Sequence, residues 1–279
     1  MSEILLVEDE RVSRHRIQKV LEEASHRVTS AASATEAMEQ LARMRFDLML
    51  LDVWLPEMSG LELLTKMKDR TELPPVVIIT ADDTPKTLLD AVRAQAYALL
   101  TKPIDPEELL STLERALKAS RETRPIRVLS AKPNWIELAA PCDRESAERI
   151  QGFLARLDTD LDPAVRDAIG RVFREMLLNA VEWGGKLDPT REVRVTYLRA
   201  RKMILYRIAD PGQGFRLKEV DHAAISNTES EPMGHVLARE KKGIRPGGFG
   251  ILMSQSLADE LLYNEAQNEV VFVKYLEGG

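Results

Sequence analysis

The chain of 279 residues has a single cysteine, Cys142. One thiol cannot form an intramolecular disulfide, so the fold must depend on apolar cores, as is usual in a reducing compartment. Long apolar runs of membrane-spanning length are also missing, and residues 1–7 lack the basic segment of a signal peptide. We therefore expect a cytoplasmic protein with no membrane segment.

An excess of basic residues is lacking as well. Residues 1–120 carry 15 Lys and Arg against 21 Asp and Glu, and residues 121–279 carry 24 of each. Neither part has the basic patch of a nucleic-acid-binding domain, nor a helix-turn-helix or zinc-finger pattern. We expect no direct DNA binding. A hydrophobic fraction of 44% and a charged fraction of 30% indicate a globular protein, and the length suffices for two domains.

In the first part, short apolar runs alternate with helical patterns. The expected strands are residues 4–7, 28–31, 47–51, 76–79 and 97–100. Helices are expected at 11–24 and 34–44, and a last one starts after Asp105, with Pro106 in first position. Strands that alternate with helices predict a doubly wound parallel sheet of five strands.

Polar residues follow four of these strands directly, namely Glu8, Asp9, Asp52, Thr80 and Lys102. In parallel sheets, ligands bind beyond the carboxyl ends of the strands, so these side chains should meet in one pocket. The three carboxylates suit Mg²⁺, and Asp52 can then attack a phosphoryl group. Thr80 and Lys102 would hold the phosphoryl oxygens. The simpler alternative is a set of unrelated strand ends and helix caps.

This set resembles the receiver domains of two-component response regulators over about residues 2–120. The matching residues are Glu8-Asp9 as the acidic pair, Asp52 as phosphoacceptor, Thr80-Ala81 as switch hydroxyl and small neighbour, and Lys102-Pro103. The resemblance implies a flavodoxin-like fold, a sensor histidine kinase as phosphodonor and a cis bond before Pro103.

The chain departs from this family pattern three residues before the lysine. Leu99 stands where receivers often have an aromatic switch residue, and strand alternation is expected to point Tyr97 to the same face. Trp54, two residues past the phosphoacceptor, is either a shield for the phosphoryl group or an exposed loop residue.

A polar, basic stretch that contains Pro125 predicts a linker at residues 122–129, between domains 1–121 and 130–279. The second domain is expected to contain strands at 135–140, 192–201, 203–208, 260–264 and 269–276. Helices are expected at 143–157, from Asp162 to Gly184-Gly185, and at 250–258. Residues 216–246 are long, polar and irregular, so we expect them to form a functional loop or lid.

Within the second helix, Glu175 and Asn179 are four residues apart and share one face. Alone, such a pair is usually solvated surface. Two glycine-rich segments follow, one with Asp210, Gly212 and Gly214 and one with Gly247, Gly248 and Gly250. Glycines let the backbone approach a phosphate, and the helix that starts at Gly250 offers free N–H groups. Lys242 and Arg245, between the segments, could reach a triphosphate.

This ordered set is similar to the histidine-kinase-like (Bergerat) ATPase fold over roughly residues 130–277, and most similar to its anti-sigma-factor serine kinase branch. The resemblance implies an α/β two-layer sandwich that binds ATP. It also implies that Asn179 binds Mg²⁺, that Glu175 is the base and that Asp210 reads adenine. A histidine or an alanine-rich helix end is common near position 183, where this chain has Trp183. We interpret Trp183 as a core residue, with a residue that reshapes the base pocket as the alternative.

Together these resemblances favour a response regulator whose receiver, phosphorylated on Asp52, controls a serine/threonine kinase output. Its partner would be an anti-anti-sigma-type protein or a sigma factor, and a homodimer is compatible with both resemblances. The alternative is a non-catalytic module that binds nucleotide and sequesters a protein. An autophosphorylating histidine kinase is disfavoured, because none of the four histidines lies in a paired-helix dimerisation pattern.

Overall fold

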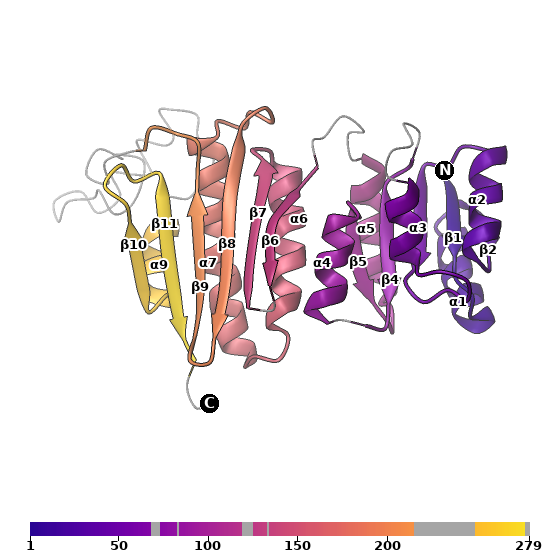
Figure 1. Cartoon of the computed structure of the whole chain (residues 1–279), viewed down its shortest axis with the longest axis horizontal. Coiled ribbons are helices and arrows are strands. Elements are labelled where there is room, and N and C mark those ends of the chain that lie inside the picture. The colour runs from indigo at the N-terminus through magenta and orange to yellow at the C-terminus, as the bar shows by residue number, and fades with distance from the viewer. Residues whose placement is uncertain (68–72, 83, 119–124, 133, 215–248, 277–279) are drawn as a thin grey trace. The chain divides into compact units, whose positions relative to one another are not determined.

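The computed structural model describes residues 1–67, 73–82, 84–118, 125–132, 134–214 and 249–276. The chain divides into two compact units, Met1–Thr123 and Arg124–Gly279, and each is described by itself (Figure 1). Among the described residues, no helix combines the length and the apolar character needed to cross a membrane.

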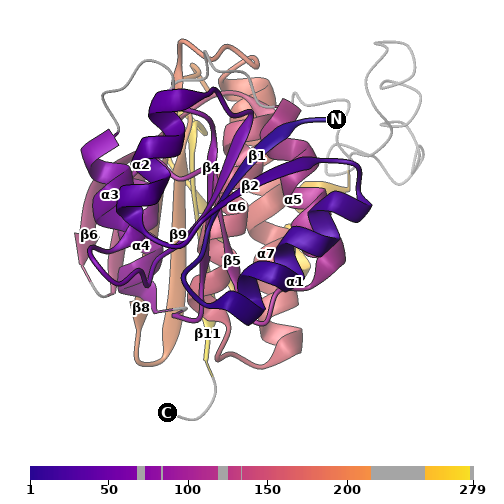
Figure 2. The same cartoon turned by 90° about the vertical axis from the view of Figure 1, so that its right-hand side faces the viewer.

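The first unit is built on a parallel sheet with the strand order β2-β1-β3-β4-β5. The strands are β1 (Glu3–Val7), β2 (Arg27–Ala31), β3 (Leu48–Asp52), β4 (Val76–Thr80) and β5 (Ala98–Thr101). The helices are α1 (Arg11–Glu23), α2 (Ala34–Arg43), α3 (Gly60–Met67), α4 (Pro85–Arg93) and α5 (Pro106–Lys118). Helices α1 and α5 cover one face of the sheet, and α2, α3 and α4 cover the other (Figure 2). The predicted doubly wound sheet is confirmed.

The central strands are buried on both sides, as their unbroken apolar sequences require. Every residue of β3 and β4 is buried, including Asp52 and Thr80 at their last positions. Asp105 caps α5 as expected, because its Oδ1 accepts the N–H groups of Glu107 at 2.7 Å and Glu108 at 3.1 Å. These caps and buried strands hold the carboxyl edge of the sheet in place.

Tyr97 does not share the face of Leu99, so that expectation was wrong. Tyr97 belongs to the same apolar cluster as Leu100 and residues of α1 and α5, and Ala98 packs against this cluster. Strand β5 begins only at Ala98, so the alternation of side chains does not extend back to Tyr97. The ring of Tyr97 is part of the core under α1 and α5.

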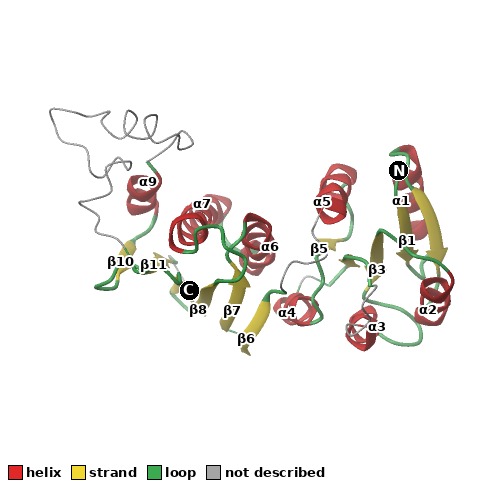
Figure 3. Ribbon diagram, turned by 90° about the horizontal axis from the view of Figure 1, so that it is seen from above, coloured by secondary structure: helices red, strands yellow, loops and turns green. Residues whose placement is uncertain are grey.

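The second unit has an antiparallel sheet with the strand order β10-β11-β9-β8-β7-β6. The strands are β6 (Arg127–Lys132), β7 (Trp135–Pro141), β8 (Glu192–Ala200), β9 (Met203–Ala209), β10 (Glu260–Tyr263) and β11 (Glu269–Tyr275). Among the described residues of this unit, the α-helices are α6 (Arg144–Leu154), α7 (Pro163–Asn179) and α9 (Gly250–Leu257), and they lie on one face of the sheet (Figure 3). The predicted two-layer α/β sandwich is confirmed.

Strand β6 differs from the sequence expectation, since its first residues fall inside the predicted linker at 122–129. It pairs with β7, for example through Val128 and Leu138. As the last strand in the sheet order it has little buried apolar surface, and Leu129 is 41% exposed. Strand β6 forms because it pairs with β7. Its own composition does not indicate a strand, so residues 127–129 resemble a linker in the sequence.

An aromatic column connects α7 to the sheet. The ring of Phe173 lies 4.7 Å from that of Tyr206 on β9, and Tyr206 stacks on Phe272 of β11 at 5.1 Å. Beneath it, the buried carboxylate of Asp158 accepts hydrogen bonds from Tyr197 at 2.8 Å and Tyr206 at 3.2 Å. Burial raises the pKa of Asp158, and the two tyrosine hydroxyls oppose this rise.

Candidate functional site

In the first unit, a lysine bridges two buried carboxylates at the carboxyl edge of the sheet. Lys102 Nζ lies 2.6 Å from Asp52 Oδ2 and 2.7 Å from Glu8 Oε2. Asp9 completes the group, since one carboxylate oxygen from each of Glu8, Asp9 and Asp52 lies within 4.8 Å of the others. The structure thus brings together four of the residues that the sequence predicted for this site.

Charge at this site is unbalanced. Burial raises the pKa of Asp52 to about 6, and the charge of Glu8 adds to this rise. The hydrogen bonds from Lys102 and from the Trp54 N–H oppose it. Burial favours a lower pKa for Lys102, but its hydrogen bonds to Asp52 and Glu8 raise that pKa. Three carboxylates face one ammonium group, so the donor set fits a hard divalent cation such as Mg²⁺.

Ser13 and Arg14, in the first turns of α1, hold the acidic pair, and sequence reasoning missed both. Ser13 Oγ donates to Glu8 Oε2 at 2.8 Å. Arg14 Nη1 donates to the carbonyl oxygens of Glu8 at 2.6 Å and Asp9 at 3.0 Å. The sequence signal that could have identified Ser13 and Arg14 is a hydroxyl and a cation about one helical turn after the acidic pair, at the start of a helix.

Thr80 is fully buried at the end of β4, on the strand next to Asp52. The register pairs Asp52 with Ile79, which places Thr80 one position further along. The backbone N–H of Lys102 donates to the carbonyl of Thr80 at 2.8 Å. The bond between Lys102 and Pro103 is cis, as the resemblance implied.

Trp54 contributes its backbone and not its ring to the carboxylate. Its N–H donates to Asp52 Oδ1 at 3.1 Å, while its side chain is 62% exposed. Of the two interpretations of Trp54, a shield for the phosphoryl group or an exposed loop residue, the geometry therefore matches the exposed loop residue.

In the second unit, Glu175 and Asn179 meet on α7 as their spacing predicted. Asn179 Nδ2 donates to Glu175 Oε1 at 3.3 Å. Gly250, the first residue of α9, lies directly against this pair, because a Cβ at position 250 would be 1.8 Å from Glu175 Oε1. Only glycine lets the start of α9 come this close to the carboxylate.

Asp210 follows β9 and lies against glycine backbone. Its Oδ1 accepts the N–H of Gly212 at 2.7 Å, and a Cβ at Gly184 would lie 2.1 Å from the same oxygen. Burial raises the pKa of Asp210, and the Gly212 N–H opposes that rise. Gly214 has a φ of 80°, and a Cβ there would be 1.5 Å from the carbonyl oxygen of Ala266. These glycines make room for the Asp210 loop.

The end of α7 confirms one expectation and corrects another. The helical segment ends at Gly184-Gly185 as predicted, but its last turn, Ala180–Gly184, is π-helical, with Gly185 as the C-cap. Such turns are often found at functional sites. Gly184 gives the space that Asp210 occupies. The expectation that Trp183 is a core residue was wrong, because Trp183 is 44% exposed.

Tyr263 on β10 belongs to the surroundings of Glu175 and was not predicted. Its hydroxyl lies 3.5 Å from Met176 Sδ. Burial raises the pKa of Tyr263 to about 12, and the charge of Glu175 adds to this rise. Strand pairing alone brings Tyr263 there, so the sequence around it carries no signal.

Four of the predicted ATP-binding residues, Lys242, Arg245, Gly247 and Gly248, lie outside the described residues, as does the expected lid at 216–246. The described part of the second site consists of Glu175, Asn179, Asp210, Gly212, Gly214 and Gly250.

Comparison with known families agrees with both halves of this description. Residues 4–114 match the response regulator receiver domain, and residues 140–274 match the histidine kinase-like ATPase domain. The chain joins a receiver domain to a histidine kinase-like ATPase domain.

Similar proteins are response regulators. A putative NtrX-like response regulator of Rickettsia bellii is 33% identical over 124 residues, which is 44% of this chain and 26% of that protein. The alginate biosynthesis transcriptional regulatory protein AlgB of Pseudomonas aeruginosa is 35% identical over 200 residues, 71% of this chain and 42% of that protein. This chain therefore spans less than half the length of either relative.

A solved structure of the chemotaxis response regulator CheY4 of Vibrio cholerae is 30% identical, covers 42% of this chain and 98% of its own, and has a TM-score of 0.40. The absence of DNA binding stays a prediction for this receiver–ATPase chain.

Proposed function

We propose that Asp52 of the receiver accepts a phosphoryl group from a sensor histidine kinase. We further propose that this controls the ATPase domain as a serine/threonine kinase of the anti-sigma type. The bridge from Lys102 to both Asp52 and Glu8, at 2.6 and 2.7 Å, is the observation that carries the proposal. A structural ion pair needs only one carboxylate for Lys102. Burying a second carboxylate beside it costs free energy unless a further cation balances its charge.

At the receiver site, an oxygen of Asp52 would form the new bond to phosphorus while the phosphorus–nitrogen bond of the donor's phosphohistidine breaks. Lys102 is placed to neutralise the added charge, and the hydroxyl of Thr80 to donate to a phosphoryl oxygen. Glu8, Asp9 and Asp52 would hold Mg²⁺, which supplies positive charge that offsets the crowding of carboxylates and phosphoryl oxygens.

In the ATPase domain, Asn179 would hold Mg²⁺ and Glu175 would take the proton from a serine or threonine hydroxyl of the partner. Asp210, held by the N–H of Gly212, is suited to accept a hydrogen bond from the amino group of adenine. The oxygen of the partner would then bond to the γ-phosphorus as the bridging bond to the β-phosphate breaks. Gly214 and Gly250 would let the backbone approach the nucleotide, and Lys242, Arg245, Gly247 and Gly248 complete the proposed set.

The partner we propose is an anti-anti-sigma-type protein or a sigma factor. The test is transfer of labelled phosphate from ATP to an anti-anti-sigma-type protein of the same organism, with and without phosphorylation of the receiver. Transfer should disappear in Glu175→Gln, and its rate should differ between phosphorylated wild type and Asp52→Ala. Equal rates in those two samples would refute the control by Asp52.

A non-catalytic module that binds nucleotide and sequesters a protein is the second candidate. It is favoured by the close contact of Glu175 with Gly250 and by the hydrogen bond from Asn179, both of which engage the carboxylate that would act as base. Intact ATP binding without any phosphate transfer, in wild type and Glu175→Gln alike, would select this candidate.

A further inference from the structure

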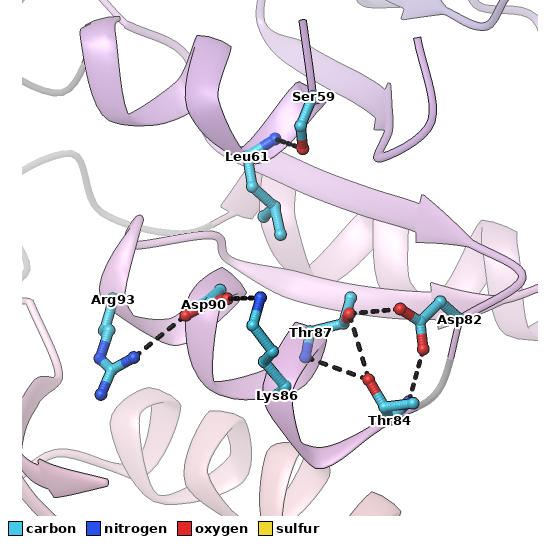
Figure 4. A network of polar contacts seen from close by, with 8 residues as sticks. All are labelled: Ser59, Leu61, Asp82, Thr84, Lys86, Thr87, Asp90 and Arg93. Atoms are coloured by element: carbon cyan, nitrogen blue, oxygen red, sulfur yellow. Dashed lines mark hydrogen bonds and ion pairs between the residues drawn. The ribbon is translucent and has the colours of Figure 1, made fainter.

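A set of hydrogen bonds connects Thr80 to the first turn of α4, and Figure 4 shows its part between Asp82, Thr84 and Thr87. Thr80 Oγ1 accepts the backbone N–H of Asp82 at 3.0 Å. The carboxylate of Asp82 in turn accepts the N–H of Thr84 at 2.9 Å and the hydroxyl of Thr87 at 2.6 Å. We name Asp82, Thr84 and Thr87 the Asp82 brace.

The brace is anchored in the core of the receiver. Thr87 is only 7% exposed, so its hydroxyl is shielded from water and bound to Asp82. Thr84 is the N-cap of α4, since its Oγ1 accepts the N–H of Thr87 at 3.4 Å. The position of the Asp82 backbone is therefore fixed by side chains of α4, beyond the loop itself.

A threonine hydroxyl has one proton to donate and lone pairs to accept with. Since Thr80 accepts from Asp82, the direction of that N–H restricts how the hydroxyl can rotate and leaves its proton free for another acceptor. The neighbouring strand ends at Asp52, one register position away. A phosphoryl group on Asp52 would supply oxygens on that side.

We propose that Asp82 and Thr87 are positioning residues for Thr80, which hold its hydroxyl in the orientation that a phosphoryl group on Asp52 requires. The proposal rests on the proposed function of Asp52.

The outer face of α4 provides a matched control. Lys86 pairs with Asp90 at 3.1 Å, and Arg93 pairs with the same carboxylate at 3.0 Å. Lys86 also acts on Asp82 through its charge, so Arg93 is the better choice: its side chain is 50% exposed, and pairs of this kind contribute little. Arg93→Ala thus changes a polar contact of the same helix at the end away from the Asp82 brace.

The test uses the full chain and measures binding of beryllium fluoride, a stable phosphoryl mimic, by calorimetry in saturating Mg²⁺. Thr87→Val keeps the shape of the side chain but removes the hydroxyl. The Thr87 hydroxyl acts on the mimic only through Thr80, so its loss should weaken binding by the worth of a typical single hydrogen bond, roughly 2- to 12-fold. Thr87→Ser restores the hydroxyl and should bind as wild type does, and so should Arg93→Ala. Asp82→Asn, at a half-buried position, should weaken binding as Thr87→Val does.

Binding of Mg²⁺ alone is the second readout, and it should be unchanged in every variant because the brace does not contact Glu8, Asp9 or Asp52. The proposal is overturned if Thr87→Val and Asp82→Asn bind the mimic as wild type does or more tightly. It is also overturned if their loss appears equally in Mg²⁺ binding, which would indicate general damage to the site. Failure of wild type itself to bind the mimic would count against the proposed role of Asp52.

Discussion

Replacing Gly184 by alanine tests whether the end of α7 shapes the proposed adenine pocket. A Cβ at this position would lie 2.1 Å from both Oδ1 and Cγ of Asp210, so the carboxylate must move. Overpacking of this kind costs about 1–3 kcal/mol of the free energy of unfolding. If Asp210 reads adenine, its displacement also removes a hydrogen bond to a charged group, worth about 1.5–3 kcal/mol, or roughly a 10- to 150-fold loss of ATP affinity.

Gly170 on the same helix is the matched control, because a Cβ there would meet nothing within 4 Å. Gly170→Ala should raise the free energy of unfolding by about 0.5–1 kcal/mol, since alanine is the better helix former. Urea unfolding gives the stability of each variant, and calorimetric titration with ATP, well below the unfolding transition, gives the affinity. A Gly184→Ala protein that matches wild type in both measurements would refute the reasoning.

Three further changes have defined outcomes. Lys102→Met leaves two buried carboxylates facing each other and should lower the free energy of unfolding by about 3–5 kcal/mol, with partial recovery on addition of Mg²⁺; urea unfolding with and without the ion checks this. The raised pKa of Asp158 means that the stability it contributes is present at low pH and is lost as pH rises through its folded pKa. Tyr197→Phe removes one bond that opposes this rise, so stability should fall further than in wild type as pH rises above the unfolded carboxyl pKa of about 3.9, and parallel curves would contradict the assignment. Gly214→Ala should lower the thermal midpoint by more than Gly170→Ala changes it, because its φ of 80° and the Ala266 carbonyl both exclude a side chain.

The receiver site could be predicted because sequence neighbours decide it. Asp52 ends a buried apolar strand and Lys102 follows another, and a parallel sheet gathers such strand ends at one edge. The pairing of Glu175 with Asn179 could be predicted as well, since the helical repeat alone puts the two residues on one face.

The parts that were missed depend on contacts between distant segments. Tyr263 approaches Glu175 through strand pairing, and strand β6 exists because β7 pairs with it. Gly184 ends the helix as predicted, but its contact with Asp210, which follows β9, had no signal in the sequence. No local pattern encodes such partners. Ser13 is the exception, because it lies five residues after Glu8 and its hydroxyl was a local signal.

The aromatic column under α7 has a mechanical consequence for the ATPase domain. Phe173 is two residues before Glu175, so the two side chains point to nearly opposite sides of the helix. Any rotation of α7 about its axis would pull Phe173 off Tyr206 and forfeit about 0.5–1.5 kcal/mol for this ring pair, in addition to buried area. The aromatic contact therefore opposes rotation of the helix that carries Glu175 and Asn179.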